Sequence, residues 1–143
     1  LNPRREDLFS SAFAKQIVEI ENGQRKILEH GNLDSIRTLC DVRDMMEAYV
    51  IATQRCNLGE VYNIGGNVIL TVGEFLEKLK KQARCKIITK LNPNLLRPVD
   101  VTKQICSTTK FYNRTGWQPK ISLDDSLSFL LDFYRERSNA IKF

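Results

Sequence analysis

Apolar residues recur at helical spacing near the start of the chain, from Asp7 to Glu21. The pattern stops at Asn22-Gly23, where glycine supplies the left-handed turn that commonly ends a helix. Similar spacing predicts four further helices, over residues 41–55, 71–84 and 107–115 and from residue 122 onward. The last residues, 138–143, are expected to fray because chain ends are rarely tied down.

Polar residues mark where three of these helices begin. Asp41, Thr71 and Ser122 can each accept a hydrogen bond from the free N–H groups of a first helical turn. Each is followed three residues later by an acidic residue, which is the spacing of a capping box. Gly116 is the expected stop of the helix over 107–115.

Short apolar or alternating runs between turn residues predict the strands. They are expected at residues 25–30, 35–40, 60–64, 68–70 and 85–91. Residues 92–102 contain two prolines and are expected to be irregular, because proline breaks a regular helix. Trp117 is expected to fill the edge of the core. Helices and strands thus alternate along one compact domain, residues 1–143, of mixed α/β class.

Composition and charge narrow the classes of function. The net charge of +5 favours anionic ligands in general. Against a nucleic-acid-binding module, the lysines fall on the polar faces of predicted helices and no aromatic cluster is interleaved with them. No apolar run is long enough to cross a bilayer and the N-terminus is not signal-like, so we expect no membrane contact and a cytoplasmic location.

The cysteines give no sign of a metal site. There are four, with no C-x-x-C pair, and His30 is the single histidine. A zinc site needs clustered ligands, so we expect no metal. The cysteines are expected to be free thiols, most of them buried.

Arg37 is the first candidate ligand-binding residue. It stands just before the predicted strand-to-helix junction at Asp41, where the backbone is rigid and a guanidinium could grip a phosphate bidentately. The alternative is a surface arginine that pairs with Asp34 or Asp41.

Arg97 and Asp100 form the second candidate. Pro98 stiffens the backbone directly after Arg97, and the carboxylate follows three residues after the arginine. A guanidinium for phosphate and a carboxylate for ribose hydroxyls suit a nucleotide. The alternative is that Arg97 and Asp100 pair with each other.

Four segments occur in the same order as in extended short-chain dehydrogenases that act on nucleotide sugars. They are Arg37–Asp44, Glu60–Gly65, Leu96–Asp100 and Thr115–Pro119. Three more segments narrow the likeness, namely Pro3–Arg5, Phe13–Ile17 and Gly31–Asp34. Over nearly its whole length the chain resembles the C-terminal, substrate-binding part of GDP-mannose 4,6-dehydratase or of its relative GDP-4-keto-6-deoxymannose reductase.

The resemblance implies roles for five side chains. Arg37 would contact the diphosphate of a GDP-sugar, while Arg97 and Asp100 would hold its nucleotide. Arg4 and Arg5 would reach the phosphate of NAD(P), in the dehydratases sometimes across a subunit interface, which implies a homo-oligomer. Most of the NAD(P) site would lie outside this chain.

Two departures from the family pattern shape the functional hypothesis. The dehydratases often carry a basic residue near Ser11–Ala12. This chain has alanine at position 12 instead, which favours the reductase. The chain also has no glycine-rich cofactor turn and no tyrosine four residues before a lysine, so we expect no hydride transfer by this chain alone. The function predicted is GDP-sugar binding within a dehydratase or reductase of deoxysugar biosynthesis. The alternative is a catalytically inactive interaction domain of the same fold.

The chain opens on Leu1 rather than on methionine, so we expect it to be a piece of a longer protein that lacks most of the Rossmann domain. Its partner would be its own N-terminal Rossmann domain. In the parent fold the helix over 41–55 and the strand over 60–64 would pack on that domain. Alone, the chain should expose this apolar face and self-associate.

Overall fold

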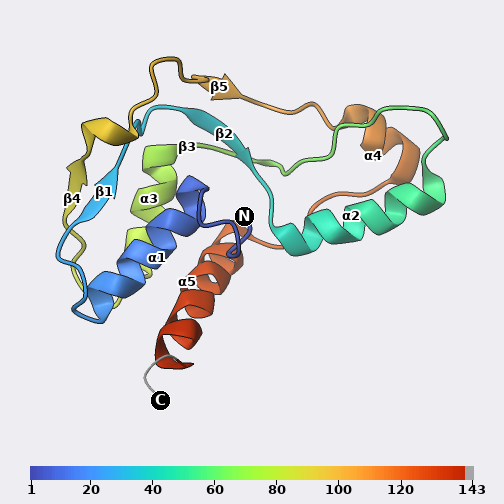
Figure 1. Ribbon diagram of the computed structural model, residues 1–143. Helices are drawn as coiled ribbons and strands as arrows, with labels where there is room; N and C mark the ends of the chain where they lie inside the picture. The colour runs from blue at the N-terminus through green and yellow to red at the C-terminus, as the bar shows by residue number, and fades with distance from the viewer. Residues whose placement is uncertain (141–143) are drawn as a thin grey trace.

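The computed structural model describes residues 1–140, in which five α-helices accompany five short strands (Figure 1). The helices are α1 (Phe9–Glu21), α2 (Val42–Arg55), α3 (Val72–Lys81), α4 (Thr109–Thr115) and α5 (Leu123–Ala140). The strands are β1 (Leu28–His30), β2 (Ile36–Leu39), β3 (Val68–Thr71), β4 (Thr89–Leu91) and β5 (Lys103–Gln104). A 3₁₀ turn, η1 (Pro93–Leu95), interrupts the segment between β4 and β5.

The strands form two small sheets. β1 pairs with β4 in parallel. In the other sheet β2 is the middle strand, antiparallel to β3 and parallel to β5. Arg37 therefore lies on a central strand, opposite Leu70 on one side and Gln104 on the other.

The main hydrophobic core lies among α1, α3 and α5, which pack together as Figure 1 shows. Its largest fully buried side chains are Ile17, Leu28, Phe75, Leu76, Leu79, Leu127, Leu130 and Leu131. The predicted capping box starts α3, because Thr71 Oγ1 accepts from the Glu74 N–H at 3.0 Å and Glu74 accepts from the Thr71 N–H at 2.8 Å. These three helices form the body to which the β2 sheet is attached.

A second, smaller core joins α2 to α4, to one side of the first (Figure 1). Ala48 of α2 and Phe111 of α4 are fully buried in it, and Trp117 is nearly so. Gly116 ends α4 with a left-handed φ of 72°, as expected. The expectation that Trp117 fills the edge of a core is confirmed for this second cluster.

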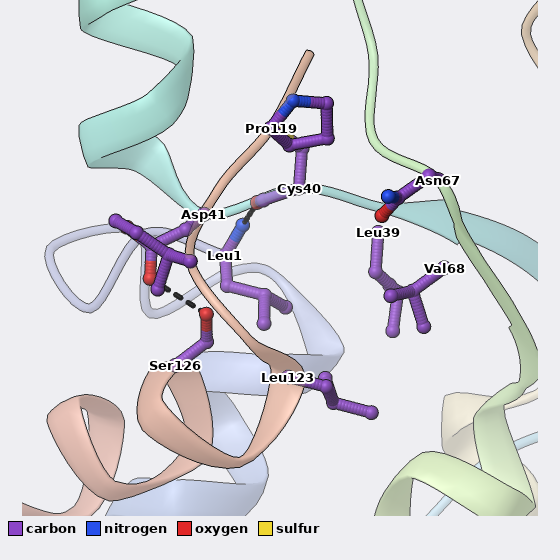
Figure 2. Close-up of a pocket in the computed structure, with 10 residues that line it drawn as sticks. Leu1, Leu39, Cys40, Asp41, Asn67, Val68, Pro119, Leu123 and Ser126 are labelled. Carbon is purple, nitrogen blue, oxygen red and sulfur yellow. Dashed lines mark hydrogen bonds between the residues drawn. The ribbon is translucent and has the colours of Figure 1, made fainter.

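Two buried carboxylates connect the start of α2 to α5 and to the segment that precedes α5. Asp41 caps α2 by accepting from the Arg43 N–H at 2.9 Å, and it also accepts from Ser126 Oγ of α5 at 2.7 Å (Figure 2). The spacing of Asp41 and Asp44 predicted a capping box, but Asp44 does not complete one. It accepts instead from the backbone N–H groups of Lys120 and Ile121, because burial beside that segment leaves those donors without another partner.

The strand predicted over residues 60–64 is wrong. Within residues 1–140 no strand pairs with this segment, and backbone without a ladder partner does not form a strand. Side chains hold it against α4 instead: Lys110 donates to the Val61 carbonyl at 2.9 Å and lies 4.5 Å from the centre of the Tyr62 ring. Val61 remains 81% exposed.

The other differences concern the ends of elements. β1 and β4 are shorter than predicted, and β5 is too short to give a sequence signal. The last helix continues to Ala140, through the first part of the segment expected to fray, and residues 141–143 lie outside the described residues. No helix in the described part is both long and apolar enough to cross a membrane.

Candidate nucleotide-binding site

Arg37 is held from several directions at the middle of the β2 sheet. Its Nη1 donates to the carbonyl of Val101 at 2.8 Å and to that of Ile36 at 2.9 Å. Its Nη2 lies 3.6 Å from Asp100 Oδ1, and only 19% of the Arg37 side chain is exposed. The alternative pairing with Asp34 or Asp41 is therefore wrong, because the β2–β5 pairing brings the end of the 92–102 loop beside Arg37.

Asp100 is the centre of this cluster. Its Oδ2 accepts from Ser35 Oγ at 2.6 Å and from Asn32 Nδ2 at 2.9 Å. These hydrogen bonds hold the pKa of Asp100 below its usual value, and the positive charge of Arg37 adds to the effect. The alternative that Asp100 pairs with Arg97 is also wrong, because its oxygens face Asn32, Ser35 and Arg37 instead.

Arg97 lies on the same loop but outside this cluster. It is exposed, and it makes no hydrogen bond or salt bridge with any other residue in the range 1–140. The loop itself is anchored where Gly31 meets η1: a Cβ on Gly31 would come within 2.6 Å of the Leu95 carbonyl oxygen. The structure thus brings Arg37 and Asp100 together. Arg97, three residues before Asp100, is exposed to solvent.

The adjacent arginines of the first loop differ in their contacts. Arg5 forms two hydrogen bonds to Asp7, at 2.8 and 2.6 Å, and this contact lowers the pKa of Asp7 to about 2. The Arg4 side chain has no salt bridge in the described range. Both are exposed at the loop before α1, so Arg4 is the freer of the two for an anionic group.

Two hollows in the molecule lie away from these residues. One, of about 10 Å³, lies beside the Asp41–Ser126 hydrogen bond (Figure 2) and is the size of a single water molecule. The other, of about 270 Å³, lies between the 65–67, 108–112 and 117–119 segments. Neither is lined by Arg37, Arg97 or Asp100. The candidate site is a cluster of side chains beside β2, in which Arg37 and Asp100 are 19% and 22% exposed.

The cysteines are free, as expected, but less buried than expected. Cys85 is exposed and Cys40, Cys56 and Cys106 are half-buried. Burial raises the pKa of the Cys40 thiol to about 11. In the described part of the chain no group of three or more histidine, cysteine, aspartate or glutamate side chains is placed to hold a metal ion.

Sequence reasoning named Arg37, Arg97 and Asp100 but missed Asn32 and Ser35. Asn32 belonged to a segment recognised only as a turn and as part of the family likeness. Nothing in its local sequence shows that its amide reaches a loop far along the chain, so only the fold reveals these two residues.

The model of the GDP-mannose 4,6 dehydratase family matches residues 2–129. The chain belongs to this family. It is 28% identical to the GDP-6-deoxy-D-mannose reductase of Pseudomonas aeruginosa over 139 residues, which are 96% of the chain and 46% of that relative. It is 27% identical to the CDP-paratose 2-epimerase of Salmonella typhi, over 85% of the chain and 37% of that protein.

Solved structures show the same relationship. The structure of RMD from Pseudomonas aeruginosa complexed with NADPH superposes with a TM-score of 0.85 at 25% identity, over 93% of this chain and 44% of that one. A UDP-glucose 4-epimerase from Thermotoga maritima, solved with UDP-glucose, gives a TM-score of 0.77 at 25% identity, over 96% and 42%. This GDP-mannose 4,6 dehydratase family chain spans less than half the length of these relatives, and its α/β fold matches about 40% of an extended short-chain dehydrogenase.

Proposed function

We propose that the chain is the GDP-sugar-binding portion of a GDP-mannose 4,6-dehydratase or of a 4-keto-6-deoxy-sugar reductase. Residues 1–143 would be its C-terminal, nucleotide-sugar-binding domain. The observation that carries the proposal is Arg37, which two carbonyls and Asp100 orient on the central strand of its sheet. Membership of the GDP-mannose 4,6 dehydratase family supports the same assignment.

In this proposal the two arginines bind the diphosphate. A guanidinium carries five N–H donors, and the two carbonyls occupy only Nη1 of Arg37. Its Nε–H and the Nη2 hydrogen that does not face Asp100 serve one phosphate oxygen, and the exposed Arg97 pairs with the other phosphate. Asp100 Oδ1, which lies 3.6 Å from Arg37 Nη2, accepts from a ribose hydroxyl.

The cofactor would be NAD(P), held mainly by residues outside this chain. A relative of similar fold was solved with NADPH. Arg4 contributes a free guanidinium to a cofactor phosphate, and Arg5 joins it by exchanging Asp7 for that phosphate. We propose that these contacts are made across a subunit boundary, within a homo-oligomer.

A reductase is favoured over a dehydratase. Ala12 of α1 occupies the place where the dehydratases often carry a basic residue. The relative that is 28% identical over 96% of the chain is a GDP-6-deoxy-D-mannose reductase.

The partner for the exposed side of α2 would be the N-terminal Rossmann domain of the same protein. Met46, Tyr49 and Val50 lie at i, i+3 and i+4, and each is about half exposed. The 60–64 segment also lacks a ladder partner among the described residues. An adjoining sheet would cover the three side chains and supply that partner.

Calorimetric titration of GDP and GDP-mannose into the 143-residue chain tests the function. We expect both to bind, and Arg37→Ala to weaken both. Lys78→Ala is the matched control, because it removes one exposed positive charge from α3 and should leave affinity unchanged. Absence of binding by the unmodified chain, or equal affinity in the Arg37 variant, would overturn the proposal.

A further inference from the structure

The turn between β1 and β2 carries a hydrogen-bond network that ends on one carboxylate oxygen. Asn32 Oδ1 accepts from the Asp34 N–H at 2.9 Å, which fixes the orientation of the Asn32 amide. Its Nδ2 then donates to Ser35 Oγ at 3.2 Å and to Asp100 Oδ2 at 2.9 Å. Ser35 Oγ in turn donates to the same Oδ2 at 2.6 Å.

Every donor in this network has one acceptor. An amide nitrogen carries two hydrogens and a hydroxyl carries one, and all three are used. Ser35 is only 2% exposed, so water does not compete for its hydroxyl. With Oδ2 held by two donors, the Asp100 carboxylate cannot rotate freely, and its Oδ1 is left facing Arg37 Nη2.

The same turn holds the Asp100 loop at a second point. Gly31 packs against the Leu95 carbonyl closely enough that only glycine fits. The loop between Leu95 and Asp100 is therefore fixed at both ends by residues 31–35. Arg97 lies between these two anchors.

We infer that Asn32 and Ser35 are positioning residues of the diphosphate site: they hold Asp100, and Asp100 holds Arg37. This inference rests on the function proposed above. Neither residue needs to touch the nucleotide, because both act through the carboxylate.

A double-mutant cycle in GDP titrations tests the chain of contacts. Ser35→Ala should weaken GDP binding by about tenfold, the scale for losing one hydrogen bond to a charged group. Asn32→Ala should act in the same direction, and it carries the test if the Ser35 variant does not fold. In an Asp100→Ala background, Ser35→Ala should have no further effect, because the group through which it acts is gone.

The pH profile separates positioning from a general structural role. The charged group that faces Asp100 is Arg37 on β2, while Asn32 and Ser35 on the turn are neutral. Loss of the Ser35 hydrogen bond should raise the pKa of Asp100, so the acid limb of GDP binding should move to higher pH in Ser35→Ala. Ser128→Ala is the control, because it removes from α5 a hydroxyl that donates to Gln82 at the end of α3, and it should change neither the affinity nor the pH profile.

The outcomes distinguish the two proposals. If Arg37→Ala weakens GDP binding while Ser35→Ala and Asn32→Ala match the unmodified chain, the positioning role is overturned and the function stands. Additive effects of Ser35→Ala and Asp100→Ala would also overturn it. If the unmodified chain binds no GDP, both proposals fall together.

Discussion

Arg37 and Asp100 face each other across the edge where β2 meets the start of β5, with Nη2 and Oδ1 3.6 Å apart. The pairing of Ile36 with Lys103 brings the end of the loop to the side of β2. Asp100 also takes two hydrogen bonds from the turn before β2. One carboxylate thus connects the turn, the strand and the loop that together form the candidate site.

Arg97→Ala is the cleanest test of ligand contact. Because Arg97 has no partner in the described range, its loss should leave the unfolding free energy within about 0.5 kcal/mol of the original. Affinity for GDP should fall by roughly 1.5–3 kcal/mol, the scale for a hydrogen bond to a charged group. Calorimetry measures the affinity and urea unfolding the stability. Unchanged affinity would remove Arg97 from the site.

Asp41 should make the fold sensitive to acid. Burial alone would raise its pKa, but hydrogen bonds from Arg43 and Ser126 outweigh this and hold the pKa at about 2. A carboxyl group whose pKa is lower when folded contributes stability above its unfolded pKa of 3.8, and loses that contribution as pH falls through about 2. We expect about 1–2 kcal/mol to be lost between pH 5 and pH 2.

Urea unfolding of Asp41→Asn across this pH range measures the effect. The variant should be less stable at pH 7 and should show a flatter dependence on pH. Asp7→Asn is the comparison: its pKa is also about 2, but its partner Arg5 and the carboxylate are both exposed and screened by solvent. Equal slopes for Asp41→Asn and the original chain would contradict the prediction.

Phe111 should be essential to the second core. It is fully buried on α4, and its ring packs edge-to-face on Trp117 at 5.7 Å and on Tyr62 at 6.2 Å. Phe111→Ala should cost about 3–5 kcal/mol of unfolding free energy, because it leaves a cavity between α2 and α4. The neighbouring Tyr112, about half exposed, is the control, and Tyr112→Ala should cost far less. Trp117 fluorescence during urea unfolding reports on this cluster directly.

Local signals predicted what local forces decide. The capping box of Thr71 with Glu74 formed as expected, because both its hydrogen bonds lie within one turn of helix. Asp44 has the same spacing from its cap residue, yet it binds the backbone at Lys120 and Ile121. Which N–H donors a carboxylate meets depends on which segment packs beside it, and that packing is set by the tertiary fold.

The dependence on tertiary packing also explains which contacts of the candidate site could not be predicted from the sequence. Arg37 could be proposed from the sequence because an arginine beside a strand-to-helix junction suits phosphate binding. Its partner Asp100 could not be predicted, since β5 is two residues long and the strand register that brings Asp100 beside Arg37 leaves no periodic signal in the sequence. The strand predicted over residues 60–64 was wrong for a related reason. Their local sequence suits a strand, but a strand forms only where a neighbouring strand pairs with it.

The exposed side of α2 leads to the last prediction. Met46, Tyr49 and Val50 form an apolar stripe on one helix face, and each is about half exposed. Contiguous apolar surface of this kind seeks a partner. In the absence of one, the chain should self-associate and bind an apolar fluorescent dye, as gel filtration and dye titration would show.

Replacing the stripe tests whether it is the cause. Tyr49→Lys combined with Val50→Lys should shift the chain toward the monomer and reduce dye binding, because charged side chains oppose burial of that face. Leu58→Lys is the control, since Leu58 is fully exposed in the loop after α2 and lies outside the stripe. A monomeric original chain without dye binding would show that the α2 face is stable in water alone, and it would remove the physical argument that an adjoining domain covers it.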